Sequence, residues 1–387
     1  MTGVPRQMRE RAPHAEQKLI GLEALRFTAA FAVLVYHYNH FYYAGDRLSD
    51  FAIKDQPFYF LFAPFYWYGE WGVHLFWCIS GFIFAWKYNG SIGAGAISFR
   101  QFVVLRLSRL YPLHFVTLLA VVSLQASYVR EHGTFFVFQP NDLKHFLLNL
   151  GFASYWGFQD GMSFNGPSWS ISAEVLVYVL FFATCRLTGR RSRLAVPMAI
   201  GVFLLAAFAQ QFLPPRAAVF LAANFFYLGV LACHLYRLMA AEPKWARAVF
   251  FQLAGLAAFV PAILIGFGGL SIEAACLLMF PAFILVFQLG IPDTFPRLNR
   301  CLIFLGNLTY ASYMLQFPMQ LAMMQLLPLA GLNLIGIRTT PAFFLVYIVT
   351  VCALSRVVHL TLEIPAQTLL RRVFLTRSVG RPGLTAS

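Results

Sequence analysis

Arg26 and His37 stand in an apolar segment, residues 19–43, that is otherwise suited to crossing a membrane. They are eleven positions apart. In an α-helix this is about 1100°, which brings both side chains to one face with a rise of about 16.5 Å between them. Glu23, three residues before Arg26, is placed to pair with it. Ionisable side chains at depth usually face a cavity and mark a functional path. The structural alternative puts His37 at the outer interface, with Arg26 reaching back to the inner surface.

A second stretch, GVHLFWCISGF at residues 72–82, contains the small pair Ser80 and Gly81. Small residues in a membrane helix usually permit close packing against another helix. The same lack of bulk also leaves room for a ligand. Both interpretations stay open from the sequence.

A third stretch, RQFVVLRLSRLYP at residues 100–112, places Arg106 and Arg109 just before Pro112. Proline is favoured in the first turn of a helix, so we expect a membrane span to start near it. The arginines then belong either to an ordinary basic cytoplasmic loop or to an anion site. Clustered guanidinium groups at the cytoplasmic mouth of a span would grip phosphates well.

Two further stretches carry polar side chains inside apolar segments. Glu174 lies about two turns into the segment at residues 166–182, where a carboxylate is costly unless it is paired or faces water. Tyr310 and Tyr313 share a helix face, and Gln316 extends that face. A structural ion pair at Glu174, and tyrosines and an amide that tie helices together, are the alternatives.

The composition defines the elements that must position these residues. The chain has 387 residues, of which 59% are hydrophobic and 11% charged, whereas soluble domains carry about 25% charged residues. Apolar runs long enough to cross a bilayer recur throughout. We therefore predict an all-α, polytopic integral membrane protein of about ten spans, at residues 20–38, 69–86, 110–127, 168–185, 194–212, 217–235, 249–267, 272–289, 302–325 and 341–358. The six cysteines occur singly in or beside apolar runs, which indicates small core residues without a disulfide framework or metal site.

The distribution of basic residues predicts the orientation. With these spans, 22 of the 29 Lys and Arg residues fall on the side of the N-terminus, and Arg26 lies within the first span. The six on the opposite side are Arg47, Lys54, Arg130, Lys144, Arg216 and Arg338. Basic loops are cytoplasmic, so both termini are predicted inside, and the net charge of +14 needs no nucleic-acid partner.

The chain reads as one membrane domain, residues 19–365, between a basic cytoplasmic segment at 1–18 and a basic cytoplasmic tail at 366–387. The first span lacks a signal-peptide cleavage site. Two long outer loops, about 39–68 and 128–167, are rich in aromatic residues. The second, with FFVFQPNDLKHFLLNLGFASYW, is predicted to include a short helix on the membrane surface.

Taken in order, the five stretches resemble the acyltransferase-3 family of integral membrane acyltransferases over about residues 19 to 365. The matching residues are Arg26 and His37, then Phe76, Ser80 and Gly81, then Arg106, Arg109 and Pro112, then Trp169, Ser170 and Glu174, and finally Tyr310 and Tyr313. Each motif alone is weak, whereas five in register on a ten-span chain are specific.

The resemblance implies an O-acetyltransferase of the bacterial inner membrane. It would move an acyl group, usually acetyl, from cytoplasmic acetyl-CoA to a hydroxyl of a carbohydrate or glycoconjugate at the outer face. The essential arginine and histidine of the family map onto Arg26 and His37. The expected donor-binding residues are Arg106, Arg109, Ser80 and Gly81, and the expected acceptor-binding residues are Trp169, Ser170, Tyr310 and Tyr313.

The chain departs from the family pattern at three points. Glu23 stands where the family often has Asp, which keeps the charge. Gln316 stands where it usually has His, so no catalytic role is assigned to Gln316. No hydrolase-like domain follows the membrane domain, so the acyl group would pass directly to the acceptor or to a separate extracytoplasmic partner.

These residues suggest a mechanism. Arg106 and Arg109 would hold the CoA phosphates, His37 would act as base for the acceptor hydroxyl, and Arg26 would line the channel. Glu174 would orient His37 and stabilise its imidazolium, as a carboxylate does in catalytic triads. Whether His37 also carries the acyl group covalently stays open, as do the acceptor, the acyl chain and the oligomeric state. A transporter or permease would explain the intramembrane charges equally well, and a non-catalytic component of a polysaccharide machine is the third class.

Overall fold

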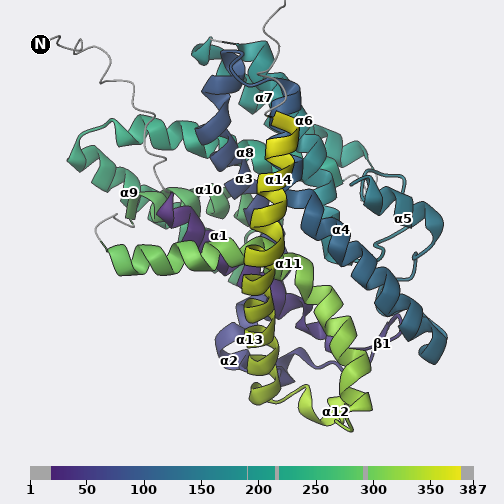
Figure 1. Cartoon of the computed structure of the whole chain (residues 1–387). Coiled ribbons are helices and arrows are strands. Elements are labelled where there is room, and N and C mark those ends of the chain that lie inside the picture. Colours follow the sequence, from purple (N-terminus) through teal and green to yellow (C-terminus); the bar gives the residue numbers. More distant parts are fainter. Residues whose placement is uncertain (1–18, 190, 214–217, 291–294, 376–387) are drawn as a thin grey trace, which may run out of the picture.

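A computed structural model of the chain describes residues 19–189, 191–213, 218–290 and 295–375. This part of the chain is almost entirely helical, which confirms the all-α membrane class (Figure 1). The helices are α1 Ile20–Tyr36, α2 Tyr59–Tyr68, α3 Gly72–Gly93, α4 Phe99–His132, α5 Leu143–Leu150, α6 Trp169–Thr188, α7 Ala195–Phe212, α8 Ala218–Ala240, α9 Lys244–Gly266, α10 Ile272–Gly290, α11 Pro296–Leu329, α12 Leu334–Ile337, α13 Pro341–Val358 and α14 Ile364–Leu375. The predicted basic segment at 1–18, the end of the tail at 376–387, and Arg190 and Arg216 lie outside the described residues.

Eight helical segments in the described chain are long and apolar enough to cross a membrane. They contain α1, α4, α6, α7, α8, α9, α10 and α13. The predicted spans at 69–86 and 302–325 fall in α3 and α11, which are long helices but do not meet the same criterion of apolarity. These two helices carry polar side chains such as Ser80 and Thr309 that face a cavity. The count of ten spans and the orientation therefore stay predictions.

Helix α4 begins well before Pro112, so the expected helix start at this proline is wrong. Ser98 caps it: the Ser98 hydroxyl accepts a hydrogen bond from the Gln101 backbone N–H (3.2 Å), and Gln101 Oε1 accepts one from the Ser98 N–H (2.9 Å). This reciprocal capping box starts a helix that runs through Pro112 to His132. Arg106 and Arg109 consequently lie on a helix rather than in a loop.

Helices α1 and α11 lie side by side, and their contacts keep one register. The Arg26 guanidinium donates to Thr309 Oγ1 (3.1 Å), and Gln320 Nε2 donates to the His37 carbonyl (2.8 Å). Both pairs are separated by 283 positions. A constant offset means that the two helices run in the same direction and rise together. This register fixes which α11 residue lies level with each residue of α1.

Gly81 allows α3 to pack closely against α8. A Cβ at Gly81 would lie 1.8 Å from the Phe226 carbonyl oxygen, and one at Gly229 would lie 1.8 Å from that of Cys78. Close helix approach through small residues is a common solution in membranes. Four of the cysteines are buried as predicted, whereas Cys301 is exposed and Cys352 is partly buried.

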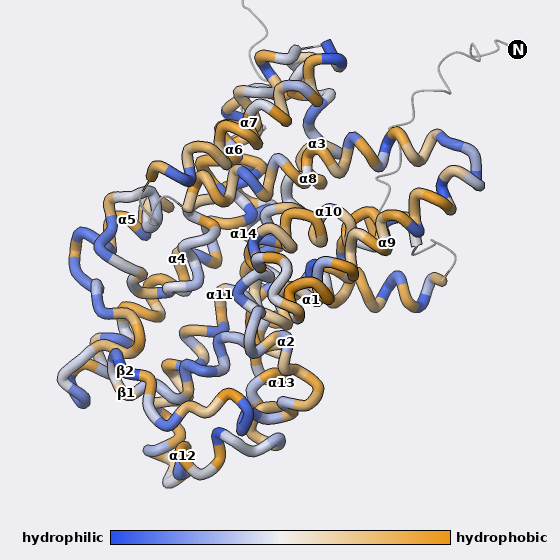
Figure 2. The backbone as a smooth tube through the Cα atoms, turned by 180° about the vertical axis from the view of Figure 1, so that it is seen from behind, coloured by the Kyte–Doolittle hydropathy of each residue, from blue (hydrophilic) through white to orange (hydrophobic). Residues whose placement is uncertain are grey.

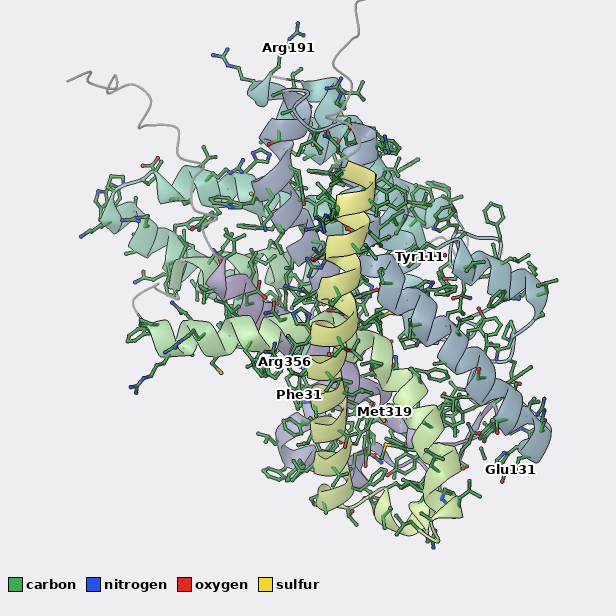
Figure 3. The ribbon with its side chains drawn as sticks, viewed as in Figure 1. Phe31, Tyr111, Glu131, Arg191, Met319 and Arg356 are labelled. Atoms are coloured by element: carbon green, nitrogen blue, oxygen red, sulfur yellow. The ribbon has the colours of Figure 1, made fainter. Side chains whose placement is uncertain are left out.

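The two predicted outer loops fold into short elements: those of the first lie in the lower part of Figure 1, and the helix of the second, α5, lies at the right of that view. The first contains α2 and a hairpin of β1 (Tyr43–Ala44) and β2 (Arg47–Leu48), which the all-helical prediction did not include. The second contains α5, which confirms the short helix; its Leu143 is 72% exposed, as a surface-lying helix requires. Arg191, between α6 and α7, and Glu131, near the end of α4, lie at opposite ends of the molecule (Figure 3).

The start of α5 is held by Asp142. The backbone N–H and the ring Nδ1 of His145 both donate to Asp142 Oδ1, at 2.9 and 2.7 Å. These hydrogen bonds lower the pKa of Asp142 from its ordinary value. Elsewhere the chain is strongly apolar, and α9 and α10 are mostly hydrophobic in Figure 2.

Candidate active site

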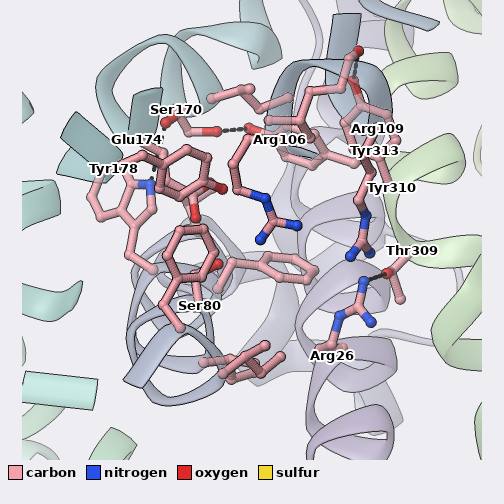
Figure 4. A pocket seen from close by; sticks show the side chains of 18 residues that line it. Arg26, Ser80, Arg106, Arg109, Ser170, Glu174, Tyr178, Thr309, Tyr310 and Tyr313 are labelled. Carbon is pink, nitrogen blue, oxygen red and sulfur yellow. Dashed lines mark hydrogen bonds between the residues drawn. The ribbon is translucent and has the colours of Figure 1, made fainter. Parts of the chain in front are cut away.

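A buried cavity of about 120 Å³ lies between α1, α3, α4, α6 and α11 (Figure 4). It collects most of the residues that the sequence singled out. Those that line it are Arg26, Ser80, Arg106, Arg109, Ser170, Glu174, Tyr310 and Tyr313. Residues from five separate stretches thus converge on one small cavity, where apolar side chains complete the wall.

A larger cavity of about 1600 Å³ adjoins it on the predicted cytoplasmic side. Arg26, Arg106, Arg109 and Tyr310 line both cavities, so the two are parts of one path. The larger cavity is strongly basic. Its basic side chains are Arg26, Lys87, Arg106, Arg109, Arg237 and Arg371, against the carboxylates Glu23 and Glu363. Such a surface attracts anions.

Arg26 is held by two partners, and a glycine makes this possible. Its guanidinium pairs with Glu23 Oε2 at 3.0 Å, which confirms the expected pairing, and it donates to Thr309. A Cβ at Gly306 would lie 1.9 Å from Glu23 Oε2, so the glycine leaves the space that the carboxylate occupies. Arg26 therefore faces the cavity in a fixed position.

Arg106 and Arg109 present unneutralised charge to the cavities. The Arg106 guanidinium lies over the Phe84 ring, 4.6 Å from its centroid, and points toward the middle of the site (Figure 4). Arg109 is exposed within the cavity wall. Neither forms an ion pair or a hydrogen bond with another described residue. Two guanidinium groups without carboxylate partners are the arrangement that binds phosphates.

Glu174 lies on the opposite wall, beside the hydroxyl groups of Ser80 and Tyr178 (Figure 4). Its Oε1 is buried and has no hydrogen-bond partner among the described residues. It forms no ion pair there, so the structural ion-pair alternative does not hold; Arg106 and Arg109 are its basic neighbours. A buried acceptor without a partner is unusual and points to a ligand that supplies the donor.

The end of the small cavity is closed by Ser170 and Tyr313. Their hydroxyl groups are 2.7 Å apart, and the Tyr313 hydroxyl also donates to the Pro167 carbonyl. Tyr310, one turn earlier, donates to the Leu110 carbonyl at 2.5 Å. Two predicted residues do not line either cavity: Gly81 packs against α8, and Trp169 packs edge-to-face on Trp77 with 5.5 Å between ring centroids.

His37 also lies outside both cavities, at the junction of α1 with a short 3-10 turn, His37–Tyr42. Its Nδ1 donates to the Val33 carbonyl at 3.0 Å, so the ring folds back along α1. It lies five residues before the end of the candidate span Ile20–Tyr42. No contact joins His37 to Glu174 within the described chain, so the predicted orientation of His37 by Glu174 is not present in this structure.

Sequence reasoning missed several partners of the site. Thr309 and Gly306 position Arg26 and Glu23, and both lie inside the stretch already noted for its tyrosines. The His40 ring lies beside the His37 ring, with 5.0 Å between centroids, and its Nδ1 donates a hydrogen bond to Gln320 Oε1 (2.9 Å). Thr309 and Gln320 are eleven positions apart, as are Arg26 and His37. This equal spacing was the sequence signal that could have indicated the pairing of the two helices.

The fold and the site together define a multi-span membrane protein with a wide basic cavity that adjoins a small one lined by Arg26, Glu174 and tyrosine hydroxyl groups. Residues 19–359 match the model of the family described as acyltransferase domain. The chain therefore belongs to the acyltransferase-3 family and is a membrane acyltransferase. No curated protein and no solved structure matches it.

Proposed function

We propose that the protein transfers an acetyl group from cytoplasmic acetyl-CoA to a hydroxyl of a carbohydrate or glycoconjugate at the outer face of the bacterial inner membrane. The observation that carries this proposal is the continuity of the two cavities. The wide cavity is basic, as the phosphates of CoA require, and the small one has a mainly apolar wall that carries Arg26, Glu174 and several hydroxyl groups. A thioester on a long flexible arm fits this sequence of spaces.

Arg106 and Arg109 are the proposed phosphate ligands, because both guanidinium groups face the wide cavity without carboxylate partners. Arg371 adds charge nearby, where it is fixed to α4 by a hydrogen bond to Ser108 Oγ (3.3 Å). Glu174 is then best placed to accept a hydrogen bond from an N–H group of the donor arm, since its Oε1 lacks a partner. Arg26 lines the passage between the cavities and contacts the donor there.

His37 is the proposed general base. Because Nδ1 donates to the Val33 carbonyl, the neutral ring carries its free lone pair on Nε2. In the transfer, Nε2 takes the proton of the acceptor hydroxyl, and the hydroxyl oxygen bonds to the thioester carbonyl carbon. The C–S bond then breaks, and the imidazolium returns the proton to the departing CoA thiolate. This ordering needs no covalent acyl-histidine.

The path to His37 is short. In the common register of α1 and α11, Tyr313 at the end of the narrow cavity lies three residues before Gln316, which is level with Val33. Three residues of helix rise about 4.5 Å. The proposed route of the acyl carbon toward the His37 ring therefore leads past the Ser170–Tyr313 hydroxyl pair.

The test is mass spectrometry of surface glycans from cells that contain the wild-type protein, the His37→Ala variant or no protein. We expect an acetyl mass increment in the wild type alone, with the variant present at normal amounts. An increment of another acyl group would identify a different donor. Uptake of a substrate without dependence on CoA, and no change in any glycan, would instead support a transporter.

A further inference from the structure

Gln316, on α11, is buried completely and is only half satisfied. Its Nε2 donates to the Tyr313 carbonyl at 3.1 Å. This contact fixes the side-chain amide, with the oxygen on the other side. Oε1 is buried and has no hydrogen-bond partner among the described residues. Since buried polar atoms are nearly always paired, this acceptor indicates a donor that appears only during function.

The α1–α11 register places this oxygen beside His37. The Arg26–Thr309 and His37–Gln320 contacts share one offset, which brings Gln316 level with Val33. The His37 ring folds back onto the Val33 carbonyl, so the ring and the Gln316 amide occupy the same level of neighbouring helices. The two side chains are neighbours there.

We propose that Gln316 is a positioning residue whose Oε1 accepts a hydrogen bond from the Nε2–H of the His37 imidazolium during acyl transfer. This inference rests on the proposed function, in which Nε2 takes the proton of the acceptor hydroxyl. In the resting state His37 Nε2 is itself a hydrogen-bond acceptor, so it cannot donate to the Gln316 oxygen. When the proton arrives, the imidazolium has two donors, and Val33 and Gln316 supply the two acceptors.

The neutral amide of Gln316 thus stabilises the His37 imidazolium, the function that was expected of Glu174. A hydrogen bond to a charged group stabilises it more than one between neutral groups, and burial strengthens the effect. The titratable group that faces His37 is His40, and its Nδ1 is already bound to Gln320. Tyr36, next in the chain, contacts the His37 ring edge-on with 5.3 Å between ring centroids, but its hydroxyl donates to Glu70. Gln316 is therefore the acceptor available to the His37 imidazolium in the described structure.

The first test compares Gln316→Leu with a matched control on the same helix, Gln325→Leu. Gln325 also donates to backbone carbonyls, those of Leu124 and Leu321, but lies beyond the site. Transfer from radiolabelled acetyl-CoA to envelope glycans is measured in native membrane vesicles. We expect Gln316→Leu to lower the maximal rate about 10- to 100-fold with little change in KM for acetyl-CoA, since the lost hydrogen bond acts on the imidazolium alone. Gln325→Leu should keep the wild-type rate.

Gln316→Glu separates positioning from packing. It keeps the shape and an acceptor oxygen, so activity should largely return. A carboxylate beside His37 favours the protonated ring, so the acid limb of the pH–rate profile should move to higher pH. If Gln316→Glu is as inactive as Gln316→Leu and the profile does not move, the residue only fills space and the proposal is wrong.

A readout that does not depend on activity is nitrogen NMR of ¹⁵N-labelled histidine rings, with the His37 signal assigned by His37→Gln. We expect the proton of the neutral ring on Nδ1, and a His37 titration that shifts to lower pH in Gln316→Leu but not in Gln325→Leu. Equal titration curves in wild type and Gln316→Leu would overturn the pairing. Full transfer activity in His37→Ala would instead overturn the general-base function itself, whatever the titration shows.

Discussion

The substitution Gly306→Ala tests whether the position of Arg26 matters more than its presence. The added methyl would meet Glu23 Oε2 at 1.9 Å, so the carboxylate must move and its 3.0 Å contact with Arg26 is lost. A hydrogen bond to a charged group stabilises a protein by about 1.5–3 kcal/mol. Replacing a glycine by alanine inside a helix stabilises the helix by about 1 kcal/mol. The free energy of unfolding should therefore fall by only about 0.5–2 kcal/mol.

Activity should fall much further than stability. Arg26 keeps Thr309 as its one fixed partner and can swing within the wide cavity, so we expect at least tenfold lower transfer from acetyl-CoA. The assay pairs this rate with thermal unfolding in detergent. The matched control is Gly255→Ala, a helix glycine whose Cβ would meet nothing within 4 Å, and it should leave both unchanged or slightly raise stability. Wild-type activity in Gly306→Ala would show that Arg26 functions without Glu23 in place, which would contradict this prediction.

Three further predictions follow from other contacts. Arg109→Leu should raise KM for acetyl-CoA at least tenfold and Arg109→Lys less so, as measured by initial rates, because the guanidinium binds phosphate; equal KM values would exclude a phosphate contact. Gly81→Leu should prevent stable insertion, seen as loss of the folded peak in size-exclusion chromatography, because its Cβ would lie 1.8 Å from the Phe226 oxygen. The α5 cap should weaken as the pH falls through the lowered pKa of Asp142. Its stabilising effect is complete above the pKa of an unfolded aspartate and is lost in acid, so hydrogen exchange of α5 should quicken at low pH in wild type and lose this pH dependence in Asp142→Asn.

Most of the site could be predicted from the sequence because burial of charge in a membrane is so costly. Arg26, Glu174 and the arginines of α4 stood out as charges within or beside apolar segments, and the structure brings them to one cavity. Helix boundaries were harder. Pro112 suggested a helix start, but the Ser98 capping box lies one apolar run earlier and begins α4 there.

The partners of the charged residues could not be predicted because they depend on how the helices pack. Glu174 was expected beside His37, yet α6 places it near Ser80 and the α4 arginines. Gln316 had no assigned role, since an amide in a helix usually just ties helices together. Only the register of α1 against α11 shows that it lies level with the His37 ring.

In the proposed mechanism, an acyl group travels from cytoplasmic CoA, past Arg106 and Arg109, to a hydroxyl activated by His37. This mechanism is tested most directly by supplying radiolabelled acetyl-CoA to sealed membrane vesicles of either orientation and counting label on the glycans. Inside-out vesicles, which expose the predicted cytoplasmic cavity, should transfer label with wild-type protein and should not with His37→Ala. Equal labelling when acetyl-CoA reaches only the outer face, or labelling by His37→Ala, would contradict the account.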